Sequence, residues 1–285
     1  MVSTSDQIDD VLLKKFGKII YEVAGIQTSD KKRALLSNRL RRRLRATGIA
    51  NFEEYYHFLC KQSQDSKEWK MFLEEITTHE TYLFRNEMQW NWFQKEFLSE
   101  IIEKNASRPV RKRLRVWSAA CSTGDEAYTV ATCCAATLPE LSKWNVEIVG
   151  TDIGVDTVKR AQNPTFDERA MRLVPSDHMK AYFTKEAGAD FWVPKEILTK
   201  MTKFKTHNLL KRFVDHPFDM VILKNVMIYF DRASRVTAVN HLTKVVKPGG
   251  YLLIGAAEGV SDYLKDDYER VFPWLYRKKG SVFGP

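Results

Sequence analysis

The sequence contains little glycine, proline and cysteine, with 13, 9 and 4 residues of these types among 285. So little Gly and Pro excludes collagen-like and low-complexity chains, and four cysteines are too few for a disulfide scaffold. Long apolar runs are absent too: no stretch approaches the roughly 18 residues of a membrane span, and the start, MVSTSDQIDD, lacks the apolar core of a secretory signal. We therefore expect a cytoplasmic globular protein that does not insert into membranes.

The four cysteines show no pattern of a functional site. Cys60, Cys121, Cys133 and Cys134 form no CxxC pair and have no histidine cluster nearby. This spacing indicates neither a zinc site nor a redox motif. We expect the four cysteines to be small, buried, hydrophobic side chains in a protein of a reducing compartment, and we expect no metal site.

Positive charge is concentrated in one segment. The formal net charge is +9, and residues 31–45, KKRALLSNRLRRRLR, hold eight Lys and Arg and no acid, so the rest of the chain sums to +1. On a helical projection Leu36, Leu40 and Leu44 form one stripe that should pack on the protein, which leaves the arginines in solvent. The basicity is a local feature and not a general sign of nucleic-acid binding.

Apolar residues recur at intervals of three and four from residue 8 to about residue 76, which predicts helices punctuated at Gly25 and Gly48. Asn51, followed by Glu54, is expected to cap the third helix. We expect an all-helical N-terminal domain at 1–77, with the basic helix at about 31–46, and a second domain at 78–285.

From Leu114 short β-rich runs alternate with helical stretches, as in LRVWSAA, DEAYTVATCCAATLPEL and NVEIVGTDI. Strand, helix and strand in succession predict a parallel sheet with right-handed crossovers. Residues of about 181–205 break the alternation with short aromatic and β-branched pieces, so we expect a small antiparallel insertion there. The tail, YERVFPWLYRKK, predicts one more strand.

The ends of the first two strands carry the features of a ligand site. The loop SAACSTGDEAY has small residues and leads at once into a helix, which lets a ligand approach its backbone closely. The second strand ends at Asp152, about 30 residues further on, where a carboxylate can accept hydrogen bonds from ribose hydroxyls. No GxGxxG pattern is present to cradle a pyrophosphate. These features favour a nucleoside cofactor without phosphates, such as S-adenosylmethionine.

Six motifs in order resemble those of the chemotaxis receptor methyltransferases of the CheR type. They are THETYLFR, WSAACSTGDEAY, GTDIG, HNLL, LKNVMIYFD and KPGGYLLIGAAE, and the helical segment with NRLRRRLRATGI is similar to that family too. The resemblance implies an α/β fold, in which an all-α N-terminal domain precedes a Rossmann-like methyltransferase domain with a small inserted antiparallel β-subdomain. It also implies an S-adenosylmethionine-dependent protein-glutamate O-methyltransferase that acts on chemoreceptors and releases S-adenosylhomocysteine.

The resemblance implies cofactor contacts from five of these motifs. The residues are His79, Thr81, Arg85, Glu126, Asp152, Asn208, Leu209, Lys224 and Asn225. Asp152 would hold the ribose, and the amide of Asn208 would offer a donor and an acceptor to adenine. The chain departs from the family's usual pattern where His79 stands in place of Asn, Lys224 in place of Arg, and Ala256 and Ala257 in place of His and Ser.

The acceptor implied by the resemblance sets what catalysis requires. A glutamate carboxylate is ionised at neutral pH, so methyl transfer to it needs no general base and depends on desolvation and alignment. We expect Arg85 and Tyr229, a cation and a phenol, to fix the acceptor oxygens. The resemblance also implies that the basic helix docks on acidic receptor helices, with Arg39, Arg42 and Arg45 as contacts.

Two functions from other classes stay open on the sequence. A nucleic-acid methyltransferase would use the same arginines for phosphates, although no NPPY-type or cysteine-nucleophile motif stands where KNVMIYF does. A non-catalytic signalling module would bind S-adenosylmethionine without transferring its methyl group. We expect a monomer that binds no nucleic acid; the sequence does not identify the receptor or its modified glutamates.

Overall fold

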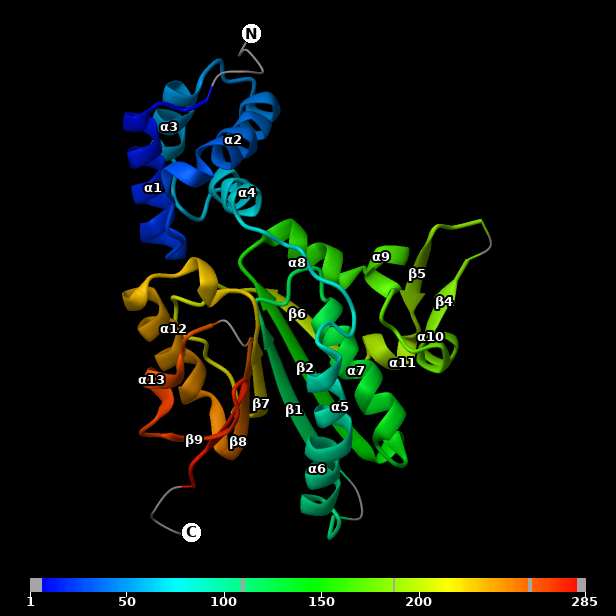
Figure 1. Ribbon diagram of the computed structural model, residues 1–285. Helices are drawn as coiled ribbons and strands as arrows, with labels where there is room; N and C mark the ends of the chain where they lie inside the picture. Colours follow the sequence, from blue (N-terminus) through cyan, green and yellow to red (C-terminus); the bar gives the residue numbers. More distant parts are fainter. Residues whose placement is uncertain (1–6, 109–110, 187, 256–257, 281–285) are drawn as a thin grey trace.

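The computed structural model describes residues 7–108, 111–186, 188–255 and 258–280. The chain forms a helical N-terminal domain, a large sheet with helices on both faces, and a small β-subdomain to one side (Figure 1). Within the described residues, no helix is both long and apolar enough to cross a membrane. Ala256 and Ala257 of the last sequence motif lie outside the described residues.

The N-terminal helices begin and end where the sequence predicts. Gly25 and Gly48, with φ of 69° and 73°, end two helices in the left-handed conformation that glycine adopts without strain. Oδ1 of Asn51 caps the next helix by accepting from the N–H of Glu54 at 2.9 Å. The elements are α1 (Asp10–Ala24), the 3₁₀-helix η1 (Asp30–Lys32), α2 (Arg33–Thr47), α3 (Phe52–Lys61) and α4 (Lys67–Ile76).

The apolar stripe of the basic helix α2 is buried, as predicted. Leu36, Leu40 and Leu44 are 5%, 0% and 3% exposed and belong to the single apolar core that the helices of this domain share. Burial of three leucines on one face contributes several kcal/mol, at roughly 1.5–3 kcal/mol for each side chain. The stripe therefore fixes which faces of α2 the arginines occupy.

The arginines of α2 do not form the acid-free, solvent-facing surface that the sequence predicted. Arg43 is buried, and its guanidinium binds both carboxylate oxygens of Glu68, at 3.0 and 2.8 Å. Arg42 donates to Glu75 at 2.6 Å. Both acids lie on α4, which is distant in the sequence and adjacent in space. The helix is therefore less cationic at its surface than its own sequence indicates.

The main sheet has seven strands in the order β6-β2-β1-β7-β8-β10-β9. The strands β6, β2, β1, β7 and β8 are mutually parallel. The strands β10 and β9 continue the sheet beyond β8 in antiparallel pairs. The chain order reverses between β1 and β7, and such a switch point is where an open α/β sheet binds ligands. The strands are β1 (Lys112–Ala119), β2 (Trp144–Asp152), β6 (Thr202–Thr206), β7 (Phe218–Leu223), β8 (Val246–Ile254), β9 (Tyr268–Phe272) and β10 (Leu275–Lys278).

Both faces of this sheet are buried, so successive side chains enter two different apolar cores. Leu114 and Val116 pack in one core with the helices α5 to α7, and Trp117 and Ala119 pack in the other with α12. Figure 1 shows these two layers on opposite sides of the sheet. The helices are α5 (Glu87–Trp92), the π-helical η2 (Phe93–Phe97), α6 (Leu98–Lys104), α7 (Asp125–Thr137), the 3₁₀-helix η3 (Leu141–Lys143), α8 (Val155–Gln162), the 3₁₀-helix η4 (Met227–Tyr229), α12 (Arg232–Lys244) and α13 (Ser261–Leu264).

A separate antiparallel sheet, in the order β3-β5-β4, forms the predicted small insertion. The expected bounds of about 181–205 are wrong at both ends. The insertion already begins at Phe166, and Thr202–Thr206 form β6, which pairs in parallel with β2 at the edge of the main sheet. Its elements are β3 (Phe166–Asp167), α9 (Glu168–Met171), α10 (Ser176–Tyr182), β4 (Phe183–Lys185), β5 (Phe191–Pro194) and α11 (Glu196–Thr199).

Two further expectations need correction. The tail forms two strands, β9 and β10, and not one, because the chain turns at Pro273 and Trp274. Cys60 is exposed on α3, whereas the other three cysteines are buried as predicted.

A buried ion-pair network centred on one arginine of β1 provides a test of what stabilises the fold. Arg115 on β1 is 2% exposed and contacts carboxylate oxygens of Glu147 at 2.7 Å and Asp215 at 2.8 Å. Arg115→Met should lower the free energy of unfolding by about 3 kcal/mol in urea denaturation, because two carboxylates lose a buried partner. Arg113→Met, an exposed position near the start of the same strand, is the control and should change the free energy of unfolding by less than about 0.5 kcal/mol. Equal losses in both variants would contradict a specific role for the network.

Candidate active site

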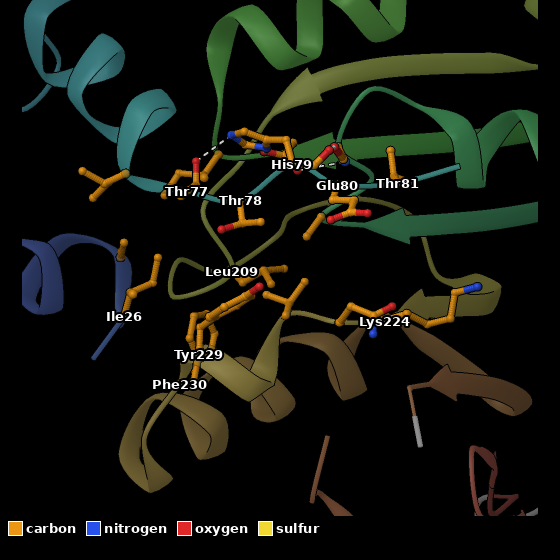
Figure 2. A pocket seen from close by; sticks show the side chains of 18 of the residues that line it. Ile26, Thr77, Thr78, His79, Glu80, Thr81, Leu209, Lys224, Tyr229 and Phe230 are labelled. Carbon is orange, nitrogen blue, oxygen red and sulfur yellow. Dashed lines mark hydrogen bonds and ion pairs between the residues drawn. The ribbon is translucent and has the colours of Figure 1, made fainter. Parts of the chain in front are cut away.

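A pocket opens where β1, β2 and β7 end. Its walls come from α1, α2, the connector between α4 and α5, and the loops that follow β1, β2, β6 and β7. Figure 2 shows connector residues 77–81 along one side, with Leu209, Tyr229 and Phe230 across the cavity. The predicted cofactor residues all line this pocket, together with Tyr229 and Arg39, whereas Arg42 and Arg45 do not.

Several segments around the pocket have an unusual backbone. Among the described residues, three non-glycine positions with positive φ line the pocket, Ala120, Ser122 and Asn225, with φ of 57°, 52° and 61°, and two more, Phe84 and Asn86, flank Arg85, with φ of 55° and 72°. Such conformations cost free energy and persist only where the surroundings impose them. The contacts that impose them therefore determine the shape of the site.

Asp152 lies at the end of β2, as predicted, and its carboxylate is almost fully buried. Oδ2 accepts from the backbone N–H of Ser122 at 2.9 Å, and Oδ1 from that of Gly154 at 3.0 Å. Nδ1 of His79 lies 3.7 Å from Oδ1. Burial raises the pKa of Asp152, while His79 and the two N–H groups act in the opposite direction. The carboxylate is thus held in a fixed orientation at the base of the pocket.

Lys224 and Glu126 form a buried ion pair in the wall of the pocket. Nζ of Lys224, at the end of β7, lies 3.1 Å from Oε2 of Glu126 on α7, and both side chains are largely buried. Ser118 donates to the other carboxylate oxygen at 2.7 Å, and the ammonium lies over the ring of Trp90 at 4.4 Å. Burial lowers the pKa of Lys224 and Glu126 opposes this. Such a pair can exchange its internal contact for the two charges of a zwitterionic ligand.

Arg85 lies in the connector, between two residues with left-handed backbone. Its Nη1 donates to the carbonyl of Glu80 at 3.3 Å, and its guanidinium lies 5.4 Å from the centre of the Tyr82 ring. Trp90 Nε1 donates to the Arg85 carbonyl at 2.8 Å. Thr81 lies on the same wall (Figure 2). The guanidinium is half-buried and can contact a ligand in the pocket.

The amide of Asn208, which lines the pocket as predicted, also forms two hydrogen bonds within the protein. Its Nδ2 donates to the carbonyl of Val23 at 2.7 Å, and its Oδ1 accepts from the N–H of Leu210 at 3.0 Å. The side chain therefore joins the loop after β6 to α1, and these bonds use one of its two N–H donors and one of the two lone pairs of its oxygen. The adjacent His207 is neutral at pH 7, because burial lowers its pKa to about 4.

The helical domain closes the far side of the pocket. The backbone N–H of Gln27 donates to the carbonyl of Tyr229 at 3.1 Å, and Nζ of Lys32 lies 5.4 Å from the centre of the Tyr229 ring. Arg39 turns inward from α2, where it donates to the Ile76 carbonyl and, at 2.9 Å, to Oγ1 of Thr78. Arg39 is thus part of the pocket wall and not of the outer basic surface.

Glu74 connects the helical domain to α8, the helix that follows β2. Its carboxylate accepts from the N–H of Thr157 at 3.2 Å, from the hydroxyl of Thr157 at 2.6 Å and from Arg160 at 3.0 Å. Thr157 lies in the first turn of α8, where a carboxylate satisfies unpaired N–H groups and the helix dipole. No local pattern in the sequence indicates this contact, because the partners are 83 residues apart.

Glu258 is a second residue of the site that the sequence reasoning missed. It is 1% exposed and its carboxylate accepts from the backbone N–H groups of Asn225, of Val226 at 3.3 Å and of Met227 at 2.7 Å. Burial raises its pKa, and these N–H groups oppose the shift. Glu258 therefore holds the loop that carries Lys224 and Asn225. An acid at the end of an apolar strand motif was the available signal.

The chain matches known family models over most of its length. Residues 79–273 match the family described as CheR methyltransferase, SAM binding domain, and residues 12–77 match the CheR methyltransferase all-alpha domain. A chemotaxis protein methyltransferase of Borreliella burgdorferi is 32% identical over 273 residues, covering 93% of each chain. One of Salmonella typhimurium is 30% identical over 264 residues, covering 91% of this chain and 87% of its own. The structure of the N-methyltransferase NodS from Bradyrhizobium japonicum matches with a TM-score of 0.38 and 15% identity, over 68% and 94% of the two chains.

Fold, pocket and family matches together define an S-adenosylmethionine-dependent methyltransferase with a Rossmann-like domain. The chain belongs to the CheR methyltransferase family.

Removing the charge of Glu258 should disturb the pocket. Glu258→Gln places an amide against backbone N–H groups that need an acceptor, so we expect a loss of about 2 kcal/mol in the free energy of unfolding. The affinity for S-adenosylhomocysteine, measured by calorimetry, should fall as well, because the loop after β7 lines the pocket. Glu269→Gln, an exposed change on β9, is the control. Unchanged stability and affinity in Glu258→Gln would refute this role.

Proposed function

We propose that the protein transfers the methyl group of S-adenosylmethionine to glutamate side-chain carboxylates of chemoreceptors, forming methyl esters. The observation that carries the proposal is that Arg85, Arg39 and Tyr229 line one pocket with the cofactor residues. Two guanidinium groups and a phenol suit an anionic acceptor. The relatives named chemotaxis protein methyltransferase support the receptor as substrate, and in this proposal the reaction takes place in the cytoplasm.

The donor set of the pocket fits the cofactor. In this proposal the carboxylate of Asp152 accepts from the ribose hydroxyls, and Lys224 and Glu126 bind the carboxylate and the ammonium of the methionine part. Asn208 and Leu209 flank the adenine, and the amide of Asn208 keeps a second donor and a second acceptor position beside its two bonds within the protein. The remaining contacts are His79, Thr81, Arg85 and Asn225.

The residues of the chain act by orientation and exclusion of water. S-adenosylmethionine supplies an electrophilic methyl group on a sulfonium. The acceptor carboxylate is ionised at neutral pH, so no residue has to remove a proton from it. Arg85 and Tyr229 hold the acceptor oxygens in line, and the wall from α1 and α2 removes water from them. Proximity and fixed charge supply the rate enhancement.

Docking of the receptor uses the outer face of the basic helix in this proposal. Arg42 and Arg45 are exposed there, whereas Arg39 contributes from the pocket wall. An acidic receptor helix laid on α2 would bring its glutamates to the mouth of the pocket, since α2 forms part of the wall. A nucleic-acid substrate is not favoured by the family matches.

The first test measures what is methylated and through which bond. With tritiated S-adenosylmethionine, label should enter the receptor protein of isolated membranes and be released by mild base, because methyl esters hydrolyse and methylated bases do not. Purified RNA should stay unlabelled. Base-stable label, or label in RNA, would contradict the proposal. Binding of S-adenosylhomocysteine without transfer to any substrate would identify a non-catalytic binding module.

The second test addresses docking. Arg45→Glu should weaken receptor methylation about tenfold at low salt, since charge reversal at the rim of an interface slows association. The effect should shrink at high ionic strength, and the affinity for S-adenosylhomocysteine should not change. Lys61→Glu is matched to it, as an exposed cation in the last turn of the neighbouring helix α3. Equal effects of the two variants would remove the basic helix from docking.

A further inference from the structure

The inserted β-subdomain braces the connector that carries Arg85. The N–H of Leu83 donates to the carbonyl of Ala170, on α9, at 3.1 Å. The ring of Phe84 lies 5.8 Å from that of His178, on α10. Leu83 and Phe84 are 0% and 4% exposed in the same core as residues of the insertion. The insertion is therefore in direct contact with the segment on which the site depends.

Tyr82, in the same segment, lies against two arginines, one in the inserted subdomain and one in the connector. The guanidinium carbon of Arg172, just after α9, lies 3.4 Å from the centre of the Tyr82 ring. The guanidinium carbon of Arg85 lies 5.4 Å from the same ring centre. Both distances are within the range at which an aromatic ring attracts a cation, and arginine stacks on such rings readily. Arg172 is itself bonded to the carbonyl of Arg169.

Arg85 lies in a strained part of the backbone, and its side chain has few contacts that fix it. Phe84 and Asn86, its two neighbours, have φ of 55° and 72°, which non-glycine residues adopt only at a cost in free energy. The guanidinium also has a hydrogen bond to the Glu80 carbonyl, at the long distance of 3.3 Å. A long, flexible side chain with one weak bond is poorly fixed, and an aromatic ring beside it restricts its rotamers.

We infer that Tyr82 is a positioning residue for Arg85, and that Arg172 of the inserted subdomain holds the Tyr82 ring in place. The inference rests on the proposed role of Arg85 in holding the acceptor or the cofactor. Tyr82 itself transfers no proton in this arrangement, so its ring and not its hydroxyl is required. The small subdomain thereby contributes to the geometry of a site that its own residues do not line.

Substitutions at Tyr82 separate the ring from the hydroxyl. Tyr82→Leu should lower kcat for receptor methylation about tenfold, because Arg85 loses the surface that orients it. Tyr82→Phe keeps the ring and should retain activity within about twofold of the wild type. Arg172→Gln should lower kcat about threefold, and the matched control Lys180→Gln, an exposed cation on α10, should not. Equal losses in Tyr82→Phe and Tyr82→Leu would overturn the inference.

A double-mutant cycle with Arg85→Ala tests whether Tyr82 acts through Arg85. If it does, Tyr82→Leu should cause no further loss in kcat when Arg85 is already absent. A purely structural role would give additive losses together with a lower melting temperature, and that result would overturn the inference. If Arg85→Ala alone leaves kcat within about threefold of the wild type, the proposed role of Arg85 fails. Loss with Arg85→Ala but wild-type activity with Tyr82→Leu would refute only the role of Tyr82.

Discussion

The carboxylate of Asp152 joins the segments from which the pocket is built. It accepts from the N–H of Ser122, after β1, and of Gly154, before α8, and it lies beside His79 of the connector. Hydrogen bonds to an ionised group are roughly twice as strong as neutral ones, and a buried carboxylate without them would be costly. These bonds therefore fix the loops after two neighbouring parallel strands relative to each other. The connector and the loops after β1 and β2 thus meet at this carboxylate, at one edge of the pocket.

The helical domain is a wall of the same pocket and not a separate module. Glu74 caps α8 directly beside the loop of Asp152, and the Asn208 amide is bonded to the Val23 carbonyl of α1. Ile26 pairs with Phe230 in an isolated antiparallel bridge. These contacts link the segments that follow β2, β6 and β7 to the domain that carries the basic helix. A displacement of α2 would therefore change the pocket as well as the outer face of the helix, so the acceptor binding and the receptor docking that we propose would both depend on this domain.

Much of the architecture could be predicted from local pattern. The leucine stripe of α2, the helix ends at Gly25 and Gly48, and the acid at the end of β2 each rest on neighbours in the sequence. Contacts between distant segments could not be predicted in this way. The bond from Glu74 to Thr157 spans 83 residues, and the insertion's bounds were missed because β6 is short and pairs only with β2 at the sheet edge. The strands β1 and β2 were visible in the sequence, but the partner of β6 and the division of the tail into β9 and β10 were not.

The same distinction explains what became of the basic segment. Its charge is local in the sequence, yet acids of α4 neutralise part of it in space, where Arg43 meets Glu68 and Arg42 meets Glu75. A buried guanidinium paired with a carboxylate contributes little to the field outside the protein. Lys32 lies over the ring of Tyr229, within the pocket wall. The net positive charge that an approaching partner meets is therefore smaller than the +8 of this segment, and part of it lies in the pocket wall, where the anionic acceptor that we propose would bind.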